Sequence, residues 1–253
     1  MTKEILELII FDLDGTLTES KSPMDTEMSM LIGELLKVYK VAVISGGSLS
    51  NFESQFLKIL RVPKEVLKNL FLFPTCGARF YRYEESWRHV YSHEFSPREK
   101  KDIFCAFDEA LPAAGYKLPD EIFGDILEDR GTQITFSGLG QRAPVELKTK
   151  WDPDMRKRLK IKSELDRHIP HFEVRIGGTT SVDVTKKGVD KAYGIKQMEL
   201  HLKVPKERMI FFGDAIFPGG NDYPVFEIGV ESVRVKDPHE TKRHIQKFIS
   251  EIL

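Results

Sequence analysis

The chain has 253 residues, which is enough for one large domain or for a core domain that carries a smaller insertion. A hydrophobic share of 41%, a charged share of 30% and a net charge of −1 fit a globular protein with no overall attraction to nucleic acid or membranes. No apolar run approaches the ~20 residues of a membrane-spanning helix, and the first strand starts too early for a signal peptide. Cys76 and Cys105 make neither a disulfide framework nor a zinc site. We therefore expect a cytoplasmic protein without nucleic-acid or membrane partners.

The most informative stretch is the apolar run Leu8–Phe11, which is followed by two acids, Asp12 and Asp14. A run that is apolar on both faces predicts a buried strand of a parallel α/β sheet, and ligands bind beyond the carboxyl ends of such strands. Residues two apart in an extended segment point to the same side, so both carboxylates can face one phosphorus. Asp12 is then the candidate nucleophile, and Asp14 the candidate general acid and base. The alternative interpretation is a plain turn, in which Asp and Gly are common.

The complete segment Asp12–Thr18, D-L-D-G-T-L-T, resembles the first motif of the haloacid dehalogenase-like (HAD) phosphotransferases. In that family the first aspartate attacks phosphorus and forms an aspartyl-phosphate. The second protonates the leaving oxygen and then activates the next acceptor. The resemblance implies a HAD-like core with a parallel sheet. It also implies a cap, inserted between the second and third motifs, that closes over the site and excludes water.

A second buried strand, Val41–Ile44, leads directly into Ser45, Gly46, Gly47 and a helix. Free backbone N–H groups at such a helix start can hold a phosphate group. The second HAD motif is a Ser or Thr at the end of this strand, so the resemblance selects Ser45, with Ser48 in reserve. The alternative is a glycine-rich connection that binds nothing.

The remaining core pattern is that of alternating helices and strands, followed by a hairpin. The predicted elements are helices at 24–38, 49–60, 190–202 and 240–252, strands at 70–73, 208–212 and 233–235, and a hairpin at 79–83 and 87–91.

Between these parts the pattern changes, and we predict an inserted α+β cap with an antiparallel sheet at residues 93–185, which leaves 1–92 and 186–253 as the core. Its predicted elements are a helix capped by Ser96, a half-buried strand at 132–137, a helix from Asp152 to Ile169 with a solvated basic run at 156–162, and a hairpin at 172–176 and 179–184 with a two-glycine turn.

Phosphoryl transfer to Asp12 needs positive charge, because two like charges about 4 Å apart repel by ~4 kcal/mol at an effective dielectric of about 20. A lone lysine at position 191 would ordinarily lie on the surface, but the resemblance assigns it to the third motif, where it pairs with the nucleophile and the phosphate. Asp214 follows a buried strand as the fourth motif. An oxygen-ligated Mg²⁺ is expected on Asp12, Asp214 and the backbone carbonyl of Asp14. Asn221 and Asp222 are expected to support this metal site or to join it.

Two further segments, Pro218–Asp222 and Ile176–Asp183, resemble the eukaryotic-type phosphomannomutases, and the order of core, cap and core is similar over nearly the full chain. That family holds the sugar and its distal phosphate with cap residues and with an arginine after the first motif. The matching positions are Arg130, Ser181 and Asp183, which keep the family's residue types, and Lys21, Gln141 and Lys148, which replace arginines. Lysine offers a point charge and glutamine no charge, so the grip on a second phosphate is weakened unless the adjacent Arg142 contributes.

Three functions follow from this pattern. The first is a Mg²⁺-dependent phosphohydrolase of a sugar phosphate or a similar small metabolite. The alternative is a phosphomannomutase that interconverts mannose 1-phosphate and mannose 6-phosphate. The third, a catalytically silent phosphosugar sensor, is disfavoured because all four motifs are intact. The sequence leaves open whether the chain forms a homodimer through its cap.

Overall fold

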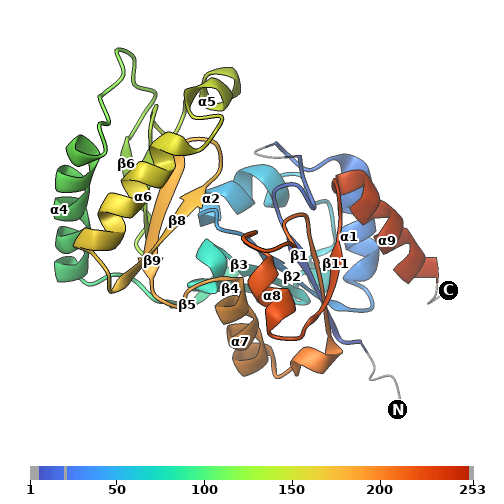
Figure 1. Cartoon of the computed structure of the whole chain (residues 1–253). Helices are drawn as coiled ribbons and strands as arrows, with labels where there is room; N and C mark the ends of the chain where they lie inside the picture. Colours follow the sequence, from blue (N-terminus) through green and yellow to red (C-terminus); the bar gives the residue numbers. More distant parts are fainter. Residues whose placement is uncertain (1–5, 20–21, 251–253) are drawn as a thin grey trace. The chain divides into compact units, whose positions relative to one another are not determined.

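The computed structural model describes residues 6–19 and 22–250, and the chain divides into two compact units (Figure 1). One unit, the core, comprises Met1–Ser92 and Val189–Leu253, and the other, the cap, comprises His93–Gly188. The chain enters the cap between Ser92 and His93 and returns to the core between Gly188 and Val189. The cap predicted from the sequence comprised residues 93–185. In the described part of the chain, no helix is both long enough and apolar enough to span a membrane.

The core is built on a mixed, mostly parallel sheet with the strand order β11-β10-β1-β2-β3-β4-β5. Its strands are β1 (Leu8–Asp12), β2 (Lys40–Ile44), β3 (Leu70–Phe73), β4 (Arg79–Tyr83), β5 (Trp87–Ser92), β10 (Met209–Gly213) and β11 (Glu231–Arg234). β11, β10, β1, β2 and β3 run parallel, whereas β4 and β5 form an antiparallel hairpin at one edge. The central strands are buried along their whole length because helices cover both faces, as their continuous apolar runs predict.

Two hydrophobic clusters fill the spaces between this sheet and its helices. The core helices are α1 (Thr26–Leu35), α2 (Leu49–Phe52), the π-helix η1 (Glu53–Leu57), α3 (Lys64–Leu67), the 3₁₀ turns η2 (Thr75–Gly77) and η3 (Lys206–Arg208), α7 (Lys191–Leu202), α8 (Tyr223–Glu227) and α9 (Pro238–Ser250). The α-helix predicted for residues 49–60 is therefore wrong beyond Phe52. There the backbone carbonyl of Gln55 accepts a hydrogen bond from the Met24 N–H, outside the helix, and the helical ladder is displaced.

The cap has an antiparallel sheet with the strand order β6-β7-β9-β8. Its elements are α4 (Pro97–Ala113), β6 (Leu127–Asp129), β7 (Gln133–Ser137), α5 (Val145–Trp151), α6 (Arg156–His168), β8 (Phe172–Gly177) and β9 (Ser181–Lys186). α4 and α6 cover one face of the sheet, where they bury Ile134, Phe136, Val182 and Val184. Because side chains alternate along a strand, the intervening residues of β7 and β9 form the other face, which we call the polar face.

β7 is buried on both sides, so the prediction of a half-buried strand is wrong for its polar side chains. Gln133, Thr135 and Ser137 are each at most 2% exposed. The Gln133 side-chain amide donates to the Thr135 hydroxyl at 2.9 Å, and that hydroxyl donates to Asp183 at 2.8 Å. Hydrogen bonds along the polar face thus replace the water that the alternating pattern predicted.

The start of α6 also differs from its prediction, because the helix begins at Arg156 and not at Asp152. The Asp152 carboxylate accepts hydrogen bonds from the backbone N–H groups of Lys157 and Arg158. It also pairs with the Arg158 guanidinium at 2.8 Å, and that guanidinium donates to the carbonyls of Gly177 and Gly178. Arg158 is only 4% exposed, so the prediction of a solvated basic run is wrong at this position.

Two cap elements, β6 and α5, were not anticipated from the sequence, and the hairpin turn is longer than predicted. β8 ends at Gly177 and β9 begins at Ser181, so three residues connect them and not two.

Candidate active site

Three carboxylates and one lysine meet at the carboxyl edge of the core sheet. Asp12 ends β1, and Asp214 follows the parallel neighbour β10. Lys191 is the first residue of α7, and its Nζ lies 2.5 Å from one oxygen of Asp12 and 2.5 Å from one oxygen of Asp222. Lys191 and Asp222 are fully buried, and Asp12 is 3% exposed. The lysine that the resemblance selected is therefore a buried bridge between two acids.

Burial raises the pKa of Asp12 to about 8, and Asp222 and Asp214 add to the increase, although Lys191 opposes it. Burial also raises the pKa of Asp214, with a further contribution from Asp222. Burial by itself would lower the pKa of Lys191, but Asp12 and Asp222 raise it above its ordinary value, so the lysine stays charged. The site therefore holds more negative charge than one lysine can compensate.

This arrangement fits a divalent cation. Carboxylate oxygens of Asp12, Asp214 and Asp222 lie within 4.8 Å of one another, and such hard donors suit Mg²⁺. Both carboxylate oxygens of Asp222 already have protein partners, since one pairs with Lys191 and the other accepts a hydrogen bond from the Ala215 N–H at 3.0 Å. Asp12 and Asp214 are thus the side chains best placed to bind the ion, while Asp222 orients Lys191. A bound cation would also favour the ionised form of Asp12, which nucleophilic attack requires.

A tight turn after β1 brings the chain against Asp214. The backbone N–H of Gly15 donates to the Thr18 carbonyl at 2.7 Å, and Asp14 bridges to Thr18. Gly15 has φ +81°, and a Cβ there would lie 2.7 Å from an oxygen of Asp214. Glycine is therefore required at this position for both its conformation and its small size. Asp14 itself is half-buried.

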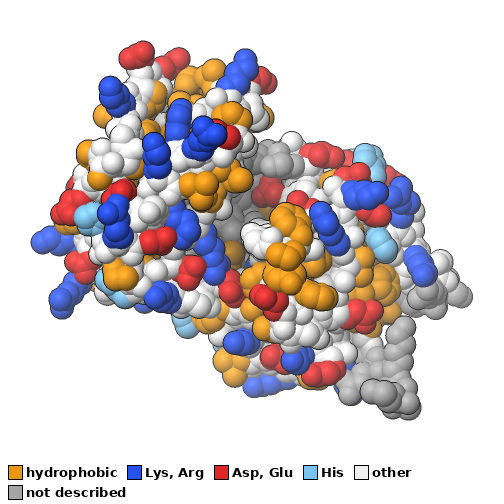
Figure 2. All heavy atoms as spheres, viewed as in Figure 1, with side chains coloured by type: hydrophobic (Ala, Val, Ile, Leu, Met, Phe, Trp, Pro, Cys, Tyr) orange, Lys and Arg blue, Asp and Glu red, His pale blue; other side chains and the backbone are white. Residues whose placement is uncertain are grey.

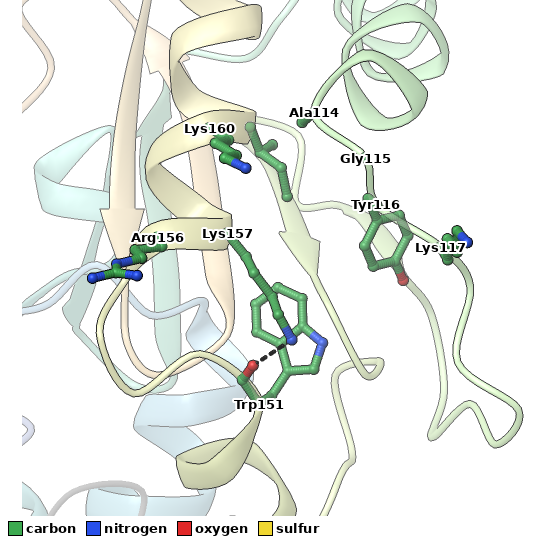
Figure 3. Close-up of a pocket in the computed structure, with 9 residues that line it drawn as sticks. Ala114, Gly115, Tyr116, Lys117, Trp151, Arg156, Lys157 and Lys160 are labelled. Atoms are coloured by element: carbon green, nitrogen blue, oxygen red, sulfur yellow. Dashed lines mark hydrogen bonds between the residues drawn. The ribbon is translucent and has the colours of Figure 1, made fainter.

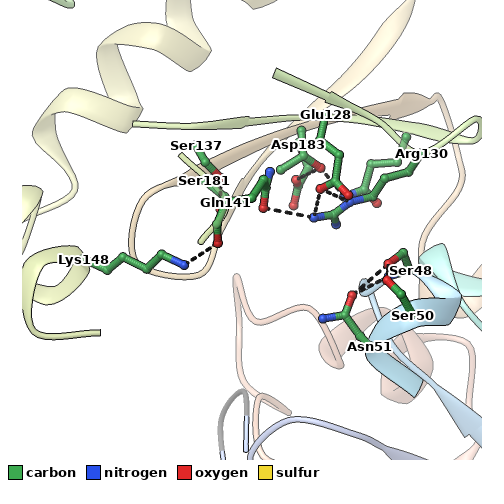
Figure 4. A network of polar contacts seen from close by, with 12 residues as sticks. Ser48, Ser50, Asn51, Glu128, Arg130, Ser137, Gln141, Lys148, Ser181 and Asp183 are labelled. Carbon is green, nitrogen blue, oxygen red and sulfur yellow. Dashed lines mark hydrogen bonds and ion pairs between the residues drawn. The ribbon is translucent and has the colours of Figure 1, made fainter. Parts of the chain in front are cut away.

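Ser45 directly follows β2, and the preceding Ile44 is the register partner of Asp12 on the neighbouring strand. The Ser45 hydroxyl is buried and accepts the Gly47 N–H at 3.0 Å. Ser48 has a different role, because its hydroxyl contacts Ser50 at 2.8 Å and donates to Asn51 at 2.9 Å at the start of α2 (Figure 4). The geometry therefore favours Ser45 over Ser48 as the second-motif residue. Gly46 and Gly47 are half-buried beside it.

The predicted cap residues gather on the polar face of the cap sheet (Figure 4). Arg130 pairs with Glu128 at 2.7 Å and donates to the Gln141 side-chain oxygen at 3.4 Å. Lys148 donates to the Gln141 backbone carbonyl at 2.8 Å. Arg130 and Lys148 therefore both contact Gln141. The cluster is completed by Asp183, which accepts from Thr135, and by Ser181, whose hydroxyl lies 3.4 Å from that of Ser137.

Burial raises the pKa of Asp183, although Arg130 and the Thr135 hydroxyl oppose the change. Glu128 was missed in the sequence analysis. Glu128 lies in β6 and Arg130 directly follows that strand. Residues two apart in an extended segment point to the same side, and the sequence could have shown Glu128 by this spacing.

Two further predicted residues, Arg142 and Asn221, have exposed side chains. Arg142 is exposed, and its guanidinium packs against Gly124, so it does not replace the charge that Gln141 lacks. Asn221 is exposed, whereas its neighbour Asp222 is buried. Lys21 lies outside the described residues.

A family model described as eukaryotic phosphomannomutase matches residues 28–251. This chain belongs to that family. The phosphomannomutase of Encephalitozoon cuniculi is 26% identical, and the match covers 100% of this chain and 97% of the relative. The phosphomannomutase of Spinacia oleracea is 29% identical over 87% of this chain and 86% of the relative.

A haloacid dehalogenase-like hydrolase from Bacteroides thetaiotaomicron is similar in structure, with a TM-score of 0.66, 15% identity, and coverage of 96% of this chain and 99% of that one. At this identity the likeness establishes the fold alone. The chain thus has a HAD-like fold, as the first motif predicted, and is an enzyme of the HAD superfamily. The family match favours the mutase alternative of the sequence analysis over the hydrolase.

Proposed function

We propose that this chain is a Mg²⁺-dependent phosphomutase of hexose phosphates, which interconverts mannose 1-phosphate and mannose 6-phosphate. The observation that carries the proposal is the buried Asp12–Lys191–Asp222 bridge in a chain that matches the phosphomannomutase family over residues 28–251. The bridge holds the nucleophile in one orientation and supplies a fixed positive charge for the transferred phosphoryl group.

In the proposed reaction, an Asp12 carboxylate oxygen first attacks one phosphorus of the hexose bisphosphate activator, and the bond from that phosphorus to the sugar oxygen breaks. Asp14 donates a proton to that leaving oxygen. A free hydroxyl of a bound hexose monophosphate then gives its proton to Asp14 and takes the phosphoryl group from Asp12, which forms a hexose bisphosphate and returns both aspartates to their initial state. After this bisphosphate turns over in the site, Asp12 takes its other phosphoryl group in the same way and the isomerised monophosphate leaves. The role of Mg²⁺, when bound, would be to offset charge on the phosphate and the acids.

We assign the hold on the sugar and its distal phosphate to the polar-face residues Arg130, Gln141, Lys148, Ser181 and Asp183. Ser45 and the adjacent glycines are assigned to the transferred phosphate. Lys21 is assigned to the distal phosphate from the family resemblance alone.

A specific observation keeps hydrolysis as the second candidate. The polar face presents Arg130 and Lys148 together with Glu128 and Asp183, so its formal charges balance, and Gln141 adds none. A mutase must retain a bisphosphate while the sugar turns over, and such retention calls for cations. If these residues hold the sugar phosphate too weakly, water takes the phosphoryl group from Asp12 and the enzyme releases phosphate.

One assay separates the two reactions. With Mg²⁺ and a hexose bisphosphate activator, we expect the rate of isomerisation of mannose 1-phosphate to exceed the rate of phosphate release. Gln141→Arg should raise the ratio of isomerisation to hydrolysis by about 10-fold, because one charge-assisted contact is worth ~1.5–3 kcal/mol. Thr149→Arg adds the same charge at an exposed position of α5 and should leave the ratio unchanged. Phosphate release that exceeds isomerisation in the unmodified enzyme would overturn the mutase assignment in favour of the hydrolase.

The role of Asp14 has a separate test based on the leaving group. A sugar oxygen is a poor leaving group and needs a proton in the transition state, whereas p-nitrophenolate does not. Asp14→Asn should therefore lower phosphoryl transfer from a hexose phosphate at least about 10-fold more than transfer from p-nitrophenyl phosphate. Equal losses with both substrates would show that Asp14 shapes the loop and does not transfer a proton.

A further inference from the structure

The cap contains a pocket that none of the assigned residues lines (Figure 3). Its volume is about 330 Å³, which lies within the range of small-molecule sites. The segment after α4, the end of α5 and the start of α6 surround it. The lining residues are Ala114, Gly115, Tyr116, Lys117, Trp151, Arg156, Lys157, Lys160 and Ile161.

Four of these nine residues carry a positive charge. Lys117 and Lys160 are exposed, and neither has an ion-pair partner among residues 6–19 and 22–250. Arg156 pairs with Asp154 at 3.0 Å, in a contact where both side chains are largely exposed. Lys157 donates to the Trp151 carbonyl at 2.7 Å, and its Nζ also lies over the Trp151 ring, 4.9 Å from the centroid. Figure 2 shows Lys and Arg side chains gathered over this part of the cap, and the pocket therefore attracts anions.

Two aromatic rings, Tyr116 and Trp151, also line the pocket, and both are held in place. Tyr116 and Trp151 lie edge to face with their ring centroids 6.5 Å apart. The Tyr116 hydroxyl donates to the Gly138 carbonyl at 3.1 Å, and Trp151 packs against Gly138, where no larger residue would fit. Both rings also contact Phe136 in the cap core. Rings that are held in place beside exposed cations can bind a planar ring at one end of a ligand and a phosphate group at the other.

The pocket belongs to the helical side of the cap sheet. Ile161, one of its lining residues, packs with Ile134 and Phe136 in the hydrophobic core beneath α4 and α6. Thr135 and Ser137 alternate with those strand residues and point to the opposite, polar face, where the proposed sugar-binding residues gather. A ligand in the pocket therefore does not share the side chains assigned to the substrate.

We propose that this pocket is a non-catalytic binding site for a nucleoside phosphate. The base would stack on Tyr116, or on Trp151 after displacing the Lys157 ammonium from that ring. The phosphates would contact Lys117, Lys160 and Arg156. No glycine-rich nucleotide-binding loop accompanies the pocket, so recognition rests on side chains. This inference does not depend on whether the enzyme is a mutase or a hydrolase.

The test uses Trp151 as the reporter. The chain has two tryptophans, so Trp87→Phe leaves Trp151 as the only one. ADP, titrated in EDTA to prevent turnover, should change the fluorescence of this variant saturably. Adenosine and inorganic pyrophosphate should each bind at least about 10-fold more weakly than ADP, because each offers only half of the recognised groups. Calorimetric titration of the unmodified chain with the same three ligands gives an independent measurement if the variant fails to fold.

Replacing both Lys117 and Lys160 by glutamate should weaken ADP binding by about 100-fold. The control variant Lys101→Glu with Lys187→Glu makes the same change of charge at exposed cap positions away from the pocket and should bind ADP like the unmodified chain. Unchanged binding in the Lys117 and Lys160 variant would overturn the proposal. Equal affinity for pyrophosphate and ADP would overturn the nucleoside assignment, and displacement of ADP by mannose 1-phosphate would place the nucleotide in the catalytic site and overturn the separate site.

Discussion

Asp12→Asn is expected to reduce phosphoryl transfer by at least about 10³-fold while the fold is retained. Asparagine has nearly the same shape as aspartate but lacks the carboxylate that attacks phosphorus, and it removes one of the three acids that could hold a cation. Lys191 keeps its second partner, Asp222, in the variant, so no buried charge is left without a counterion. Turnover with a hexose phosphate and Mg²⁺ measures the loss, and circular dichroism with thermal unfolding measures the fold.

Asp108→Asn makes the same chemical change at an exposed position of α4 and should leave turnover unaffected. If Asp12→Asn retained activity near that of the unmodified enzyme, the aspartyl-phosphate mechanism would be wrong, whatever the substrate.

Lys191→Met should have the largest effect on stability, lowering the free energy of unfolding by about 3–5 kcal/mol near neutral pH. The substitution keeps an unbranched side chain of similar length but leaves two buried carboxylates, Asp12 and Asp222, without their shared cation. Activity should also fall to background, because the fixed positive charge for the phosphate is lost.

The loss of stability should depend on pH with a defined sign. Burial already raises the pKa of Asp12 to about 8 with Lys191 present, and removal of the lysine raises it further. A carboxyl group whose pKa is higher in the folded than in the unfolded chain destabilises the fold as pH rises from its unfolded value towards its folded one. From the unfolded pKa of Asp12 up to about pH 8, both chains lose the same stability through this group, and above about pH 8 only the variant continues to lose it. The difference between Lys191→Met and the unmodified chain should therefore be larger at about pH 9.5 than at about pH 7.

Urea unfolding in EDTA at both pH values measures this difference without a bound cation. Lys196→Met, at an exposed position of the same helix, should change the free energy of unfolding by less than about 0.5 kcal/mol. Equal stability of Lys191→Met and the unmodified chain at both pH values would show that the bridge contributes nothing to the fold.

The sequence by itself determined the fold class and the position of the first motif. Leu8–Phe11 is apolar on both faces, and such a strand is stable only between two helical layers, which fixes its place at the centre of a parallel sheet. The carboxyl end of that strand is then where ligands bind, so Asp12 and Asp14 could be selected from local pattern alone. The prediction of the fold class is confirmed because strand periodicity and turn chemistry act over a few neighbouring residues.

Tertiary structure decided which charged residues are buried and what they contact. Lys191 lies 179 residues from Asp12 and 31 from Asp222 in the chain, and no local pattern marks the three as one bridge. Arg158 belongs to a basic run that resembles a solvated helix face, yet Asp152 and the hairpin carbonyls bury it. A charge leaves water only where partners from several segments converge to replace its hydration, and that convergence is a property of the folded chain.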